Sequence, residues 1–427
     1  MRQIILAAAL TASFLAMPKI ARSNEISDMK DEMKKMEEKD RVLQEELKEQ
    51  RAITDHLKKK MDALENSDSL MNDDGELEGK PVDHYSDGHS ERGIGIPKLK
   101  ISGFMDTSFN TTLSKDAHSK TFKLGEIDLF MASQISEKVS FLAELVSYPF
   151  STNPRYVFEW QRVGLRYSLS DHFNIMIGRM HTALGFWNHA YHHGTWLQTT
   201  IQRPEIYRFE YDNGLLPVHS IGIEFSGIQV FQPLQLEYHL GVINGRDKDI
   251  QSINNFNDGN DAKALSALVS IKPHFVEGLQ AGVNIYIDRI PPNRTPFSGA
   301  PVRNGQIDER IVGAHLVYLQ DGIEFLTELF KIYHHDRPSG DHFDTAGYYI
   351  QMGYKIDKWI PYYRFDFINL AEGDPFFIPL QTDLKKHTVG LRWDILTWNA
   401  LKFEYQTIRR KDADREQTLA VNSSFAF

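Results

Sequence analysis

The last strand-like segment of the chain constrains its fold more than any other feature. Between Leu401 and Thr407, Leu, Phe, Tyr and Thr alternate with Lys, Glu and Gln. A second alternating run ends on Phe427. Successive side chains of a β-strand point to opposite faces of a sheet. The pattern therefore predicts strands with one apolar and one polar face.

Similar alternating segments recur from Leu99 onward, with turn residues between them. Regular short strands without helical interludes favour an all-β fold. A strand plus its connection takes about 20 residues, so the region from 98 to 427 predicts an antiparallel β-barrel of ~16 strands, with 14 or 18 as alternatives. The clearest strands are expected at residues 99–110, 139–147, 220–230, 234–243, 279–287, 323–333, 348–356 and 391–395.

The first residues have the pattern of a secretory signal. Arg2 precedes a short apolar stretch from Ile4 to Met17, and small residues follow at Ala21 and Ser23. Residues 1–23 are therefore expected to form a cleaved signal peptide, with an ordinary buried helix as the alternative. No later run of ~18 apolar residues predicts a membrane-spanning helix. Only a closed barrel could then cross a bilayer, because lipid cannot satisfy open sheet edges.

Residues 24–65 carry a heptad pattern. From Ile26 to Leu64, twelve positions follow a 3-4 spacing, and nine of them are apolar. This spacing predicts a left-handed, α-helical coiled coil, and a single solvated amphipathic helix is the alternative. Residues 66–97 are rich in Asp, Gly and Ser and nearly free of apolar side chains, so we expect a flexible linker there.

Composition limits the chemistry available to the chain. There is no cysteine, so a disulfide, a thiolate metal site and a cysteine nucleophile are excluded. From Leu99 onward the chain has 37 Asp and Glu against 32 Lys and Arg, a net charge of −5. This excess of acidic residues argues against a channel dedicated to phosphate, although a local row of basic residues could exist within the overall total.

Several of these segments resemble bacterial outer-membrane porins, particularly long-chain relatives with an N-terminal coiled coil. The segments that carry the resemblance are 173–179 (FNIMIGR), 241–245 (GVING), 347–351 (GYYIQ), 361–364 (PYYR) and the final pair of strands ending in Phe427. The resemblance implies a Gram-negative outer-membrane barrel that forms trimers and passively conducts small solutes. It also implies that Phe427 is part of the signal recognised by the barrel-assembly machinery.

In a water-filled barrel, the polar side chains, which occupy alternate positions of each strand, face the lumen. A charged side chain facing lipid would cost about 2–4 kcal/mol for Lys or Arg at mid-depth, so parity predicts which residues line the pore. The alternative role for each is an internal ion pair that braces the wall. The candidate pore-lining residues are Arg162, Arg166, Asn284, Asp288, Glu324, Glu328, Arg364, Asp366, Arg392 and Asp394.

The segment from Arg179 to His219 is too long for a tight turn and is rich in histidine and aromatic residues. We expect it to form a constriction or lid. Its candidate constriction residues are His181, Trp187, His189, Tyr191, His192, His193 and Trp196.

The histidines of this loop raise two further expectations. His189 and His193 are four apart, as helical metal ligands can be, but no acidic residue completes a zinc motif. We therefore expect packing histidines, without a metal or other cofactor. An ordinary histidine pKa of about 6.5 would make the conductance depend on pH between roughly 5 and 8.

The leading hypothesis is a trimeric porin for passive diffusion of small hydrophilic solutes, with its N-terminal region in the periplasm. The coiled coil could contact peptidoglycan, and outer-membrane lipid would surround the barrel. Alternatives are a channel for a metal complex or organic anion gated by the histidine-rich loop, or a plugged barrel acting as an adhesin, scaffold or lipid esterase. An enzyme is not expected, because the cluster at residues 334–336 (HHD) has no evident nucleophile and is expected in a hydrated loop. The sequence has no basic arm that would suggest nucleic-acid binding.

Overall fold

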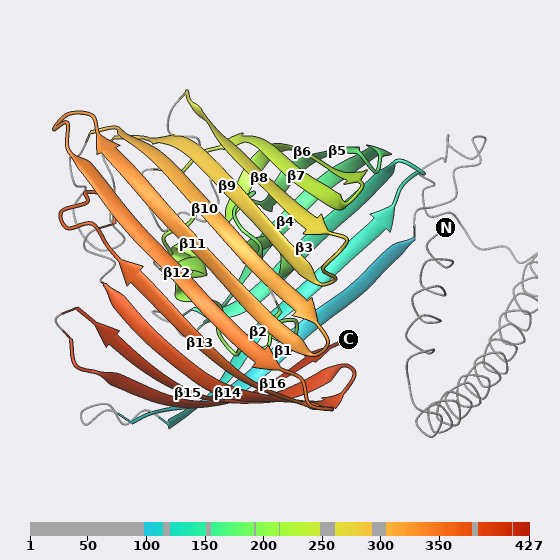
Figure 1. Cartoon of the computed structure of the whole chain (residues 1–427), viewed down its shortest axis with the longest axis vertical. Coiled ribbons are helices and arrows are strands. Elements are labelled where there is room, and N and C mark those ends of the chain that lie inside the picture. Colours follow the sequence, from blue (N-terminus) through green and yellow to red (C-terminus); the bar gives the residue numbers. More distant parts are fainter. Residues whose placement is uncertain are drawn as a thin grey trace, which may run out of the picture. The chain divides into compact units, whose positions relative to one another are not determined.

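The computed structural model describes residues 98–427, apart from residues 114–119, 151–154, 192–193, 213, 248–260, 293–304, 378–382 and 412. The expected signal peptide, coiled coil and linker, at residues 1–23, 24–65 and 66–97, lie outside the described residues. Sixteen strands form one closed antiparallel barrel in which each strand pairs with its neighbours in sequence (Figure 1). The expected number of ~16 strands is therefore confirmed, and the alternatives of 14 and 18 are excluded.

The first eight strands are β1 (Leu99–Thr112), β2 (Lys120–Gln134), β3 (Val139–Phe150), β4 (Arg155–Ser170), β5 (Phe173–His181), β6 (His219–Phe231), β7 (Leu234–Asn244) and β8 (Lys263–Pro273). The other eight are β9 (Leu279–Ile290), β10 (Ile307–Gln320), β11 (Ile323–Asp336), β12 (His342–Tyr354), β13 (Trp359–Asn369), β14 (Leu384–Leu396), β15 (Asn399–Arg410) and β16 (Glu416–Ala426). Each segment expected from alternation overlaps a strand, although 348–356 runs two residues past the end of β12. The largest error is at β14, whose first seven residues fall outside the expected 391–395.

The barrel closes where its first strand meets its last. β1 and β16 pair from Phe104 opposite Ala426 to Thr112 opposite Thr418. Just beyond this ladder, the backbone amides of Gly103 and Phe427 each donate to the carbonyl of the other, at 2.9 and 3.0 Å. The terminal residue therefore takes part in closing the barrel.

The wall has apolar side chains outside and polar ones inside. On β9, the outward Val283 is 61% exposed and Ile287 is 47% exposed, whereas the inward Asn284 and Asp288 are each 5% exposed. This is the reverse of a soluble protein, whose large apolar side chains are mostly buried. An apolar outer band is what a lipid environment requires of a barrel.

The two ends of the barrel differ in their connections. One end has tight turns, such as the link between β10 and β11, where Asp321 and Gly322 have φ values of 55° and 77°. Two successive residues with positive φ are typical of a type I′ hairpin turn, and glycine adopts that conformation without strain. The other end carries long connections, including 182–218 and 245–262 (Figure 1).

In the described residues, three short helical turns interrupt the all-β pattern, and all of them lie in the connection between β5 and β6. They are α3 (Trp187–Ala190) and the 3₁₀ turns η1 (Glu205–Tyr207) and η2 (Glu210–Asp212). None of the helices in the described part of the chain is long and apolar enough to cross a membrane.

The largest apolar cluster of the described residues joins this connection to the lumen wall. Leu184, Trp187 and Tyr207 of the connection are buried in one cluster with wall residues such as Phe330 and Tyr349. The barrel therefore contains a packed core, and this core positions the candidate site.

Candidate functional site

The connection between β5 and β6, residues 182–218, folds inward and is called the inner loop here (Figure 1). It begins with a sharp turn at Gly185, whose φ is 67°. A Cβ at this position would clash with the hydroxyl of Tyr207 and the carboxylate of Glu328. Glycine is therefore required both by the backbone conformation and by the lack of space.

Glu328 of β11 anchors the start of the inner loop. Its carboxylate accepts hydrogen bonds from the backbone amides of Phe186 and Trp187, at 2.7 and 2.9 Å. It also accepts bonds from the hydroxyls of Tyr207 and Tyr349, at 2.7 and 2.8 Å. Four donors satisfy a carboxylate that is almost fully buried, so the free-energy cost of burying it is small.

Buried cations of the wall hold the next part of the inner loop, residues 195–203. Arg364 of β13 donates to the carbonyls of Gln202 and Arg203 at 2.7 and 3.0 Å. Lys402 of β15 donates to three loop carbonyls, among them that of Thr200 at 3.0 Å. These charge-assisted bonds are stronger than neutral ones and fix the backbone of the loop.

Acidic residues add to this anchoring. The carboxylate of Asp366 accepts the backbone amide of Glu205 at 2.9 Å, and the side chain of Glu205 accepts a bond from Lys386 at 2.8 Å. Burial alone would raise the pKa of Glu205, but the positive charges of Lys386 and Arg208 outweigh it and lower this pKa to about 2. Glu205 therefore stays ionised and paired at any physiological pH.

A second ionic cluster holds the end of the inner loop. Arg246, just after β7, donates to the carbonyl of Leu215 and to both carboxylate oxygens of Glu309, at 2.9 and 3.1 Å. Glu309 also contacts His334 at 3.0 Å, and His334 contacts Asp374 at 2.8 Å. The inner loop is thus fixed at its start, middle and end.

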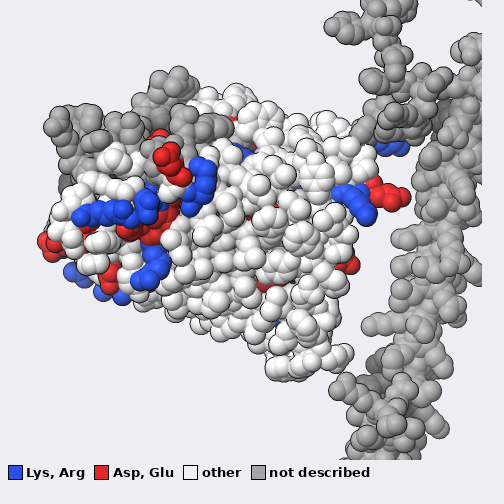
Figure 2. Space-filling view, turned by 90° about the horizontal axis from the view of Figure 1, so that it is seen from above, with Lys and Arg blue, Asp and Glu red and all other residues white. Residues whose placement is uncertain are grey.

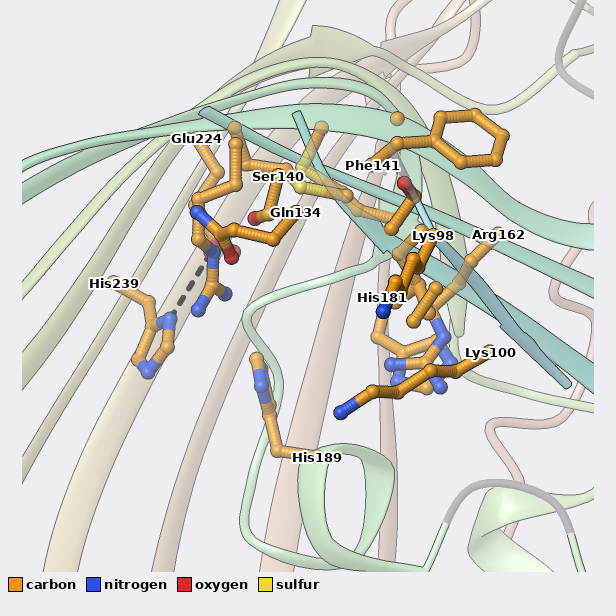
Figure 3. Close-up of a pocket in the computed structure, with 17 residues that line it drawn as sticks. Lys98, Lys100, Gln134, Ser140, Phe141, Arg162, His181, His189, Glu224 and His239 are labelled. Atoms are coloured by element: carbon orange, nitrogen blue, oxygen red, sulfur yellow. Dashed lines mark hydrogen bonds and ion pairs between the residues drawn. The ribbon is translucent and has the colours of Figure 1, made fainter. Parts of the chain in front are cut away.

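A cavity of about 810 Å³ remains beside the inner loop. It is bordered by residues of β1 to β7 and by His189 of the loop. Figure 3 shows Lys98, Lys100 and Arg162 grouped on one side of this space, with His189 reaching toward it from the loop. The inner loop therefore occupies one part of the lumen and leaves an open part along the first strands.

The lining of this cavity is strongly basic. Four cations and three histidines face one carboxylate, that of Glu224, which contacts His239 at 3.1 Å. The lining cations and histidines are Lys98, Lys100, Arg162, Arg166, His181, His189 and His239. This local surplus contrasts with the net negative charge of the barrel region.

His189 does not have the titration expected of an ordinary histidine. Burial and the neighbouring His239 lower the pKa of His189 to about 4, although Glu224 and Glu237 partly oppose this shift. The ring is therefore neutral between pH 5 and 8, and it cannot produce the pH response expected in that range.

The expected pore-lining residues fall into two groups. Arg162 and Arg166 border the cavity, and Arg162 also pairs with Glu144. The others meet the inner loop or neighbouring wall side chains: Glu324 accepts a bond from Thr199 at 2.5 Å, and Arg392 donates to the carbonyls of Trp196 and Gln198 at 2.8 Å. Of the remaining residues, Glu328, Arg364 and Asp366 anchor the inner loop as described above. Asp394 pairs with Arg392. Asp288 accepts a hydrogen bond from the backbone amide of Arg246, and Asn284 is buried.

The expected constriction residues are also divided. His181 and His189 border the cavity. Trp187 is buried and packs on Tyr191 with ring centroids 4.8 Å apart, and Trp196 stacks on Phe104 of β1 at 5.8 Å. His192 and His193 lie outside the described residues. Within the described ranges, no group of three or more His, Asp or Glu side chains is placed to hold a metal ion.

Sequence reasoning missed several residues of the site. Lys98 and Lys100 border the cavity, and Lys386 and Lys402 anchor the inner loop. Lys402 is one of the polar residues that alternate with apolar ones between Leu401 and Thr407, so alternation alone could have identified it. The expectation that residues 334–336 lie in a hydrated loop was wrong, because all three lie in β11 and His334 is fully buried.

Comparison with known proteins supports the fold. No protein-family model matches the chain, and no curated protein sequence matches it. An anion-selective porin from Comamonas acidovorans aligns with 78% of this chain and 100% of its own, at a TM-score of 0.55 and 11% identity. The outer-membrane channel DcaP of Acinetobacter baumannii aligns with 78% of this chain and 97% of its own, at a TM-score of 0.55 and 10% identity.

OmpF of Salmonella typhi, solved in complex with daunomycin, gives a TM-score of 0.53 at 11% identity and covers 78% of this chain and 98% of its own. OmpT of Vibrio cholerae in its trimer form also gives 0.53, at 10% identity over 78% and 100%. At such identities the likeness concerns the fold alone. The chain has the 16-stranded barrel fold of bacterial outer-membrane porins.

Proposed function

We propose that this protein is an outer-membrane porin that lets small hydrophilic solutes diffuse through a water-filled channel. The observation that carries the proposal is the cavity of about 810 Å³ that the inner loop leaves open along β1 to β7. A barrel with an apolar outer face and a charge-lined inner cavity suits passive diffusion across a membrane. The fold shared with porins supports the same function.

The test is conductance in a planar lipid bilayer. Full-length protein should insert in steps of uniform current, each of which reports one open channel. Closed barrels that insert without any current would overturn the proposal and favour the alternative of a plugged barrel acting as an adhesin or scaffold.

Anions are the preferred solutes in this proposal. Lys98, Lys100, Arg162 and Arg166 border the cavity and attract negative charge, and rings of Lys and Arg are how pores select anions. Among the alternatives, an organic anion fits this lining better than a cationic metal complex does. The local charge of the lining outweighs the net charge of the barrel, because distant exposed charges are screened within about 10 Å at 0.1 M salt.

Reversal potentials under a KCl gradient test the preference for anions. The unmodified channel should favour chloride, and the double variant Lys100→Gln/Arg166→Gln should reduce the preference. Lys385→Gln is the matched control, because that side chain is exposed and points away from the lumen. A wild-type preference for potassium would overturn the anion preference and leave the channel function intact.

An enzymatic role has little support in the candidate cluster around His334. Both ring nitrogens of this histidine face carboxylates, Nδ1 that of Asp374 and Nε2 that of Glu309. A histidine acting as a general base needs a nucleophile within hydrogen-bond reach. His334 instead bridges two acids, which is a structural arrangement, and a channel therefore explains the barrel better than a lipid esterase.

The proposed setting of the chain follows from its sequence. Residues 1–23 direct export, 24–65 form a periplasmic coiled coil, and 66–97 link it to the outer-membrane barrel. A homotrimer is proposed on the heptad pattern and on the trimer form of the Vibrio cholerae barrel. Analytical ultracentrifugation of the full chain tests this assembly: three copies per particle are expected, and a monomer would overturn it.

A further inference from the structure

The connection between β13 and β14 places a second segment inside the barrel. Its residues Phe376 and Phe377 are fully buried, and they belong to the same apolar cluster as Leu215 and Leu216 at the end of the inner loop. We call residues 374–377 the capping segment. Because the capping segment fills part of the lumen, the contacts that hold it in place also set how much of the lumen is open.

Four buried side chains of alternating charge connect the capping segment to the inner loop. Arg246, which donates to a carbonyl of the inner loop, pairs with Glu309 at 2.9 Å. Glu309 contacts Nε2 of His334 at 3.0 Å, and Nδ1 of His334 contacts Asp374 at 2.8 Å. The other carboxylate oxygen of Asp374 accepts the backbone amide of Phe376 at 2.9 Å. We call Arg246, Glu309, His334 and Asp374 the latch.

The geometry of the latch requires a charged imidazole. A neutral histidine ring has one N–H and one nitrogen lone pair. Both ring nitrogens of His334 lie within hydrogen-bond distance of a carboxylate oxygen, so a neutral ring would point its lone pair at one of the two carboxylates. Both nitrogens therefore carry hydrogen. Loss of either proton leaves a buried carboxylate without its partner, which is strongly unfavourable.

The latch lies close to the solvent at one end of the barrel. Figure 2 shows charged side chains of both signs gathered at the end with the long connections, beside a largely uncharged surface. A groove of about 490 Å³ is bordered by Arg310 and Asp344 near this end of β10 and β12, and also by Glu309 and His334 of the latch. The groove gives protons a short route between the solvent and the latch.

We propose that the latch is a pH-sensitive switch: the capping segment stays docked while His334 carries both protons, and it leaves the lumen when the ring loses one of them at alkaline pH. Release joins the space under the capping segment to the solute path and raises the conductance. This effect on conductance rests on the proposed channel function, whereas the docking of the segment does not.

The surroundings of His334 favour the docked state near neutral pH. Glu309 of β10 and Asp374 of the connection face the ring directly, and Arg246 acts on it through Glu309. The rings of Phe376 and Phe377 pack on the imidazole, with centroids 5.7 and 4.9 Å away. Two adjacent carboxylates stabilise an imidazolium, so the switch is expected to operate above neutral pH.

The reactivity of a single cysteine measures docking without any use of conductance. The chain has no cysteine, and the fully buried Thr345 accepts the backbone amide of Ala371, in the same connection, at 3.0 Å. Full-length Thr345→Cys in detergent micelles should therefore react slowly with a maleimide near neutral pH. Adding His334→Gln should speed the reaction about tenfold or more, because a glutamine amide can donate to only one of the two carboxylates.

The matched control is His335→Gln, which changes the neighbouring histidine, whose side chain is 40% exposed. Added to Thr345→Cys, it should leave the rate of labelling unchanged. Equal labelling with and without His334→Gln would overturn the latch. Where His334→Gln gives no heat-modifiable barrel, Asp374→Asn replaces it, because that change lies in the connection and leaves every strand intact.

Single-channel conductance tests the switch itself. From about pH 7 to about pH 10, the conductance of the wild type and of His335→Gln should rise, whereas His334→Gln should already conduct more near neutral pH and should lack this rise. Titration of lysines would change all three channels alike. Identical pH profiles of the wild type and His334→Gln would overturn the switch. Faster labelling of His334→Gln in a protein that carries no current would overturn the channel function and leave the latch intact.

Discussion

Two arginines of the lumen wall, Arg162 and Arg364, have similar places in their alternating strands but very different surroundings. The Arg162 side chain is 24% exposed and borders the cavity. The Arg364 side chain is 0% exposed and holds the inner loop. Arg162 pairs with Glu144 but remains partly exposed to the cavity, whereas Arg364 is enclosed by fixed partners. The same residue type therefore borders the cavity at one position and anchors the inner loop at the other.

Replacing Arg364 should destabilise the barrel. Arg364→Ala leaves Asp366 buried without its partner and removes bonds to the backbone of the inner loop. Loss of one member of a buried ion pair costs about 3–5 kcal/mol. Arg409→Ala, at an exposed position at the end of β15, should cost no more than about 0.5 kcal/mol. Chemical denaturation in detergent micelles measures both; equal midpoints for the two variants would contradict the anchoring role.

His189 should respond to pH only in acid. With its pKa lowered to about 4 by burial and by His239, the ring is neutral above pH 5, and Glu224, Glu237 and Arg162 are the other charged groups acting on it. Wild-type and His189→Gln channels should have the same conductance profile from pH 8 to 5 and diverge near pH 4. Divergence centred near pH 6.5 would mean that the ring is hydrated.

The same pKa shift has a consequence for stability. In the unfolded chain His189 takes up its proton near pH 6.5, whereas the folded protein resists protonation until about pH 4. The unfolded state binds more protons within this interval, so the contribution of His189 to stability is full above pH 6.5 and falls as the pH drops toward 4. Thermal melts should show a smaller loss of stability over this interval in His189→Gln than in the wild type.

At the scale of elements, the strands were accessible from sequence and the course of the inner loop was not. Alternation is a local property, so β7, β9 and β11 could be located from their own residues. The position of the loop depends on Glu328, Arg364 and Lys402, which are distant in sequence. No local pattern distinguishes an anchoring Arg from a cavity-lining one, because the difference arises only when the loop covers one part of the wall.

Shortening the inner loop should widen the passage. Deletion of Ala190–Thr195 removes the last residue of α3 and the residues up to Trp196, whose ring packs against Phe104 on β1. Single-channel conductance should increase, because less of the lumen is then filled. Deletion of Ser339 and Gly340 from the exposed turn between β11 and β12 is the control and should leave conductance unchanged. Parental conductance in the inner-loop deletion would place this part of the loop outside the solute path.

At the scale of the whole molecule, the last residue takes part in closing the barrel. Phe427 exchanges two backbone hydrogen bonds with Gly103, beside the ladder between β1 and β16. Deletion of Phe427 should lower the yield of heat-modifiable barrel in the outer membrane. Phe427→Ala separates the effect of the backbone hydrogen bonds from that of the aromatic side chain, since it keeps the bonds and loses the side chain. Normal yield from the deletion would remove the role of this residue in assembly.

The anchoring of the inner loop also sets an order of events during biogenesis. Trp187 is separated by 141 residues from its partner Glu328, and Thr200 by 202 residues from Lys402. The inner loop can therefore reach its final position only after these distant strands have joined the barrel. Docking must await completion of the later strands, and a chain stalled partway would leave this segment open to proteases.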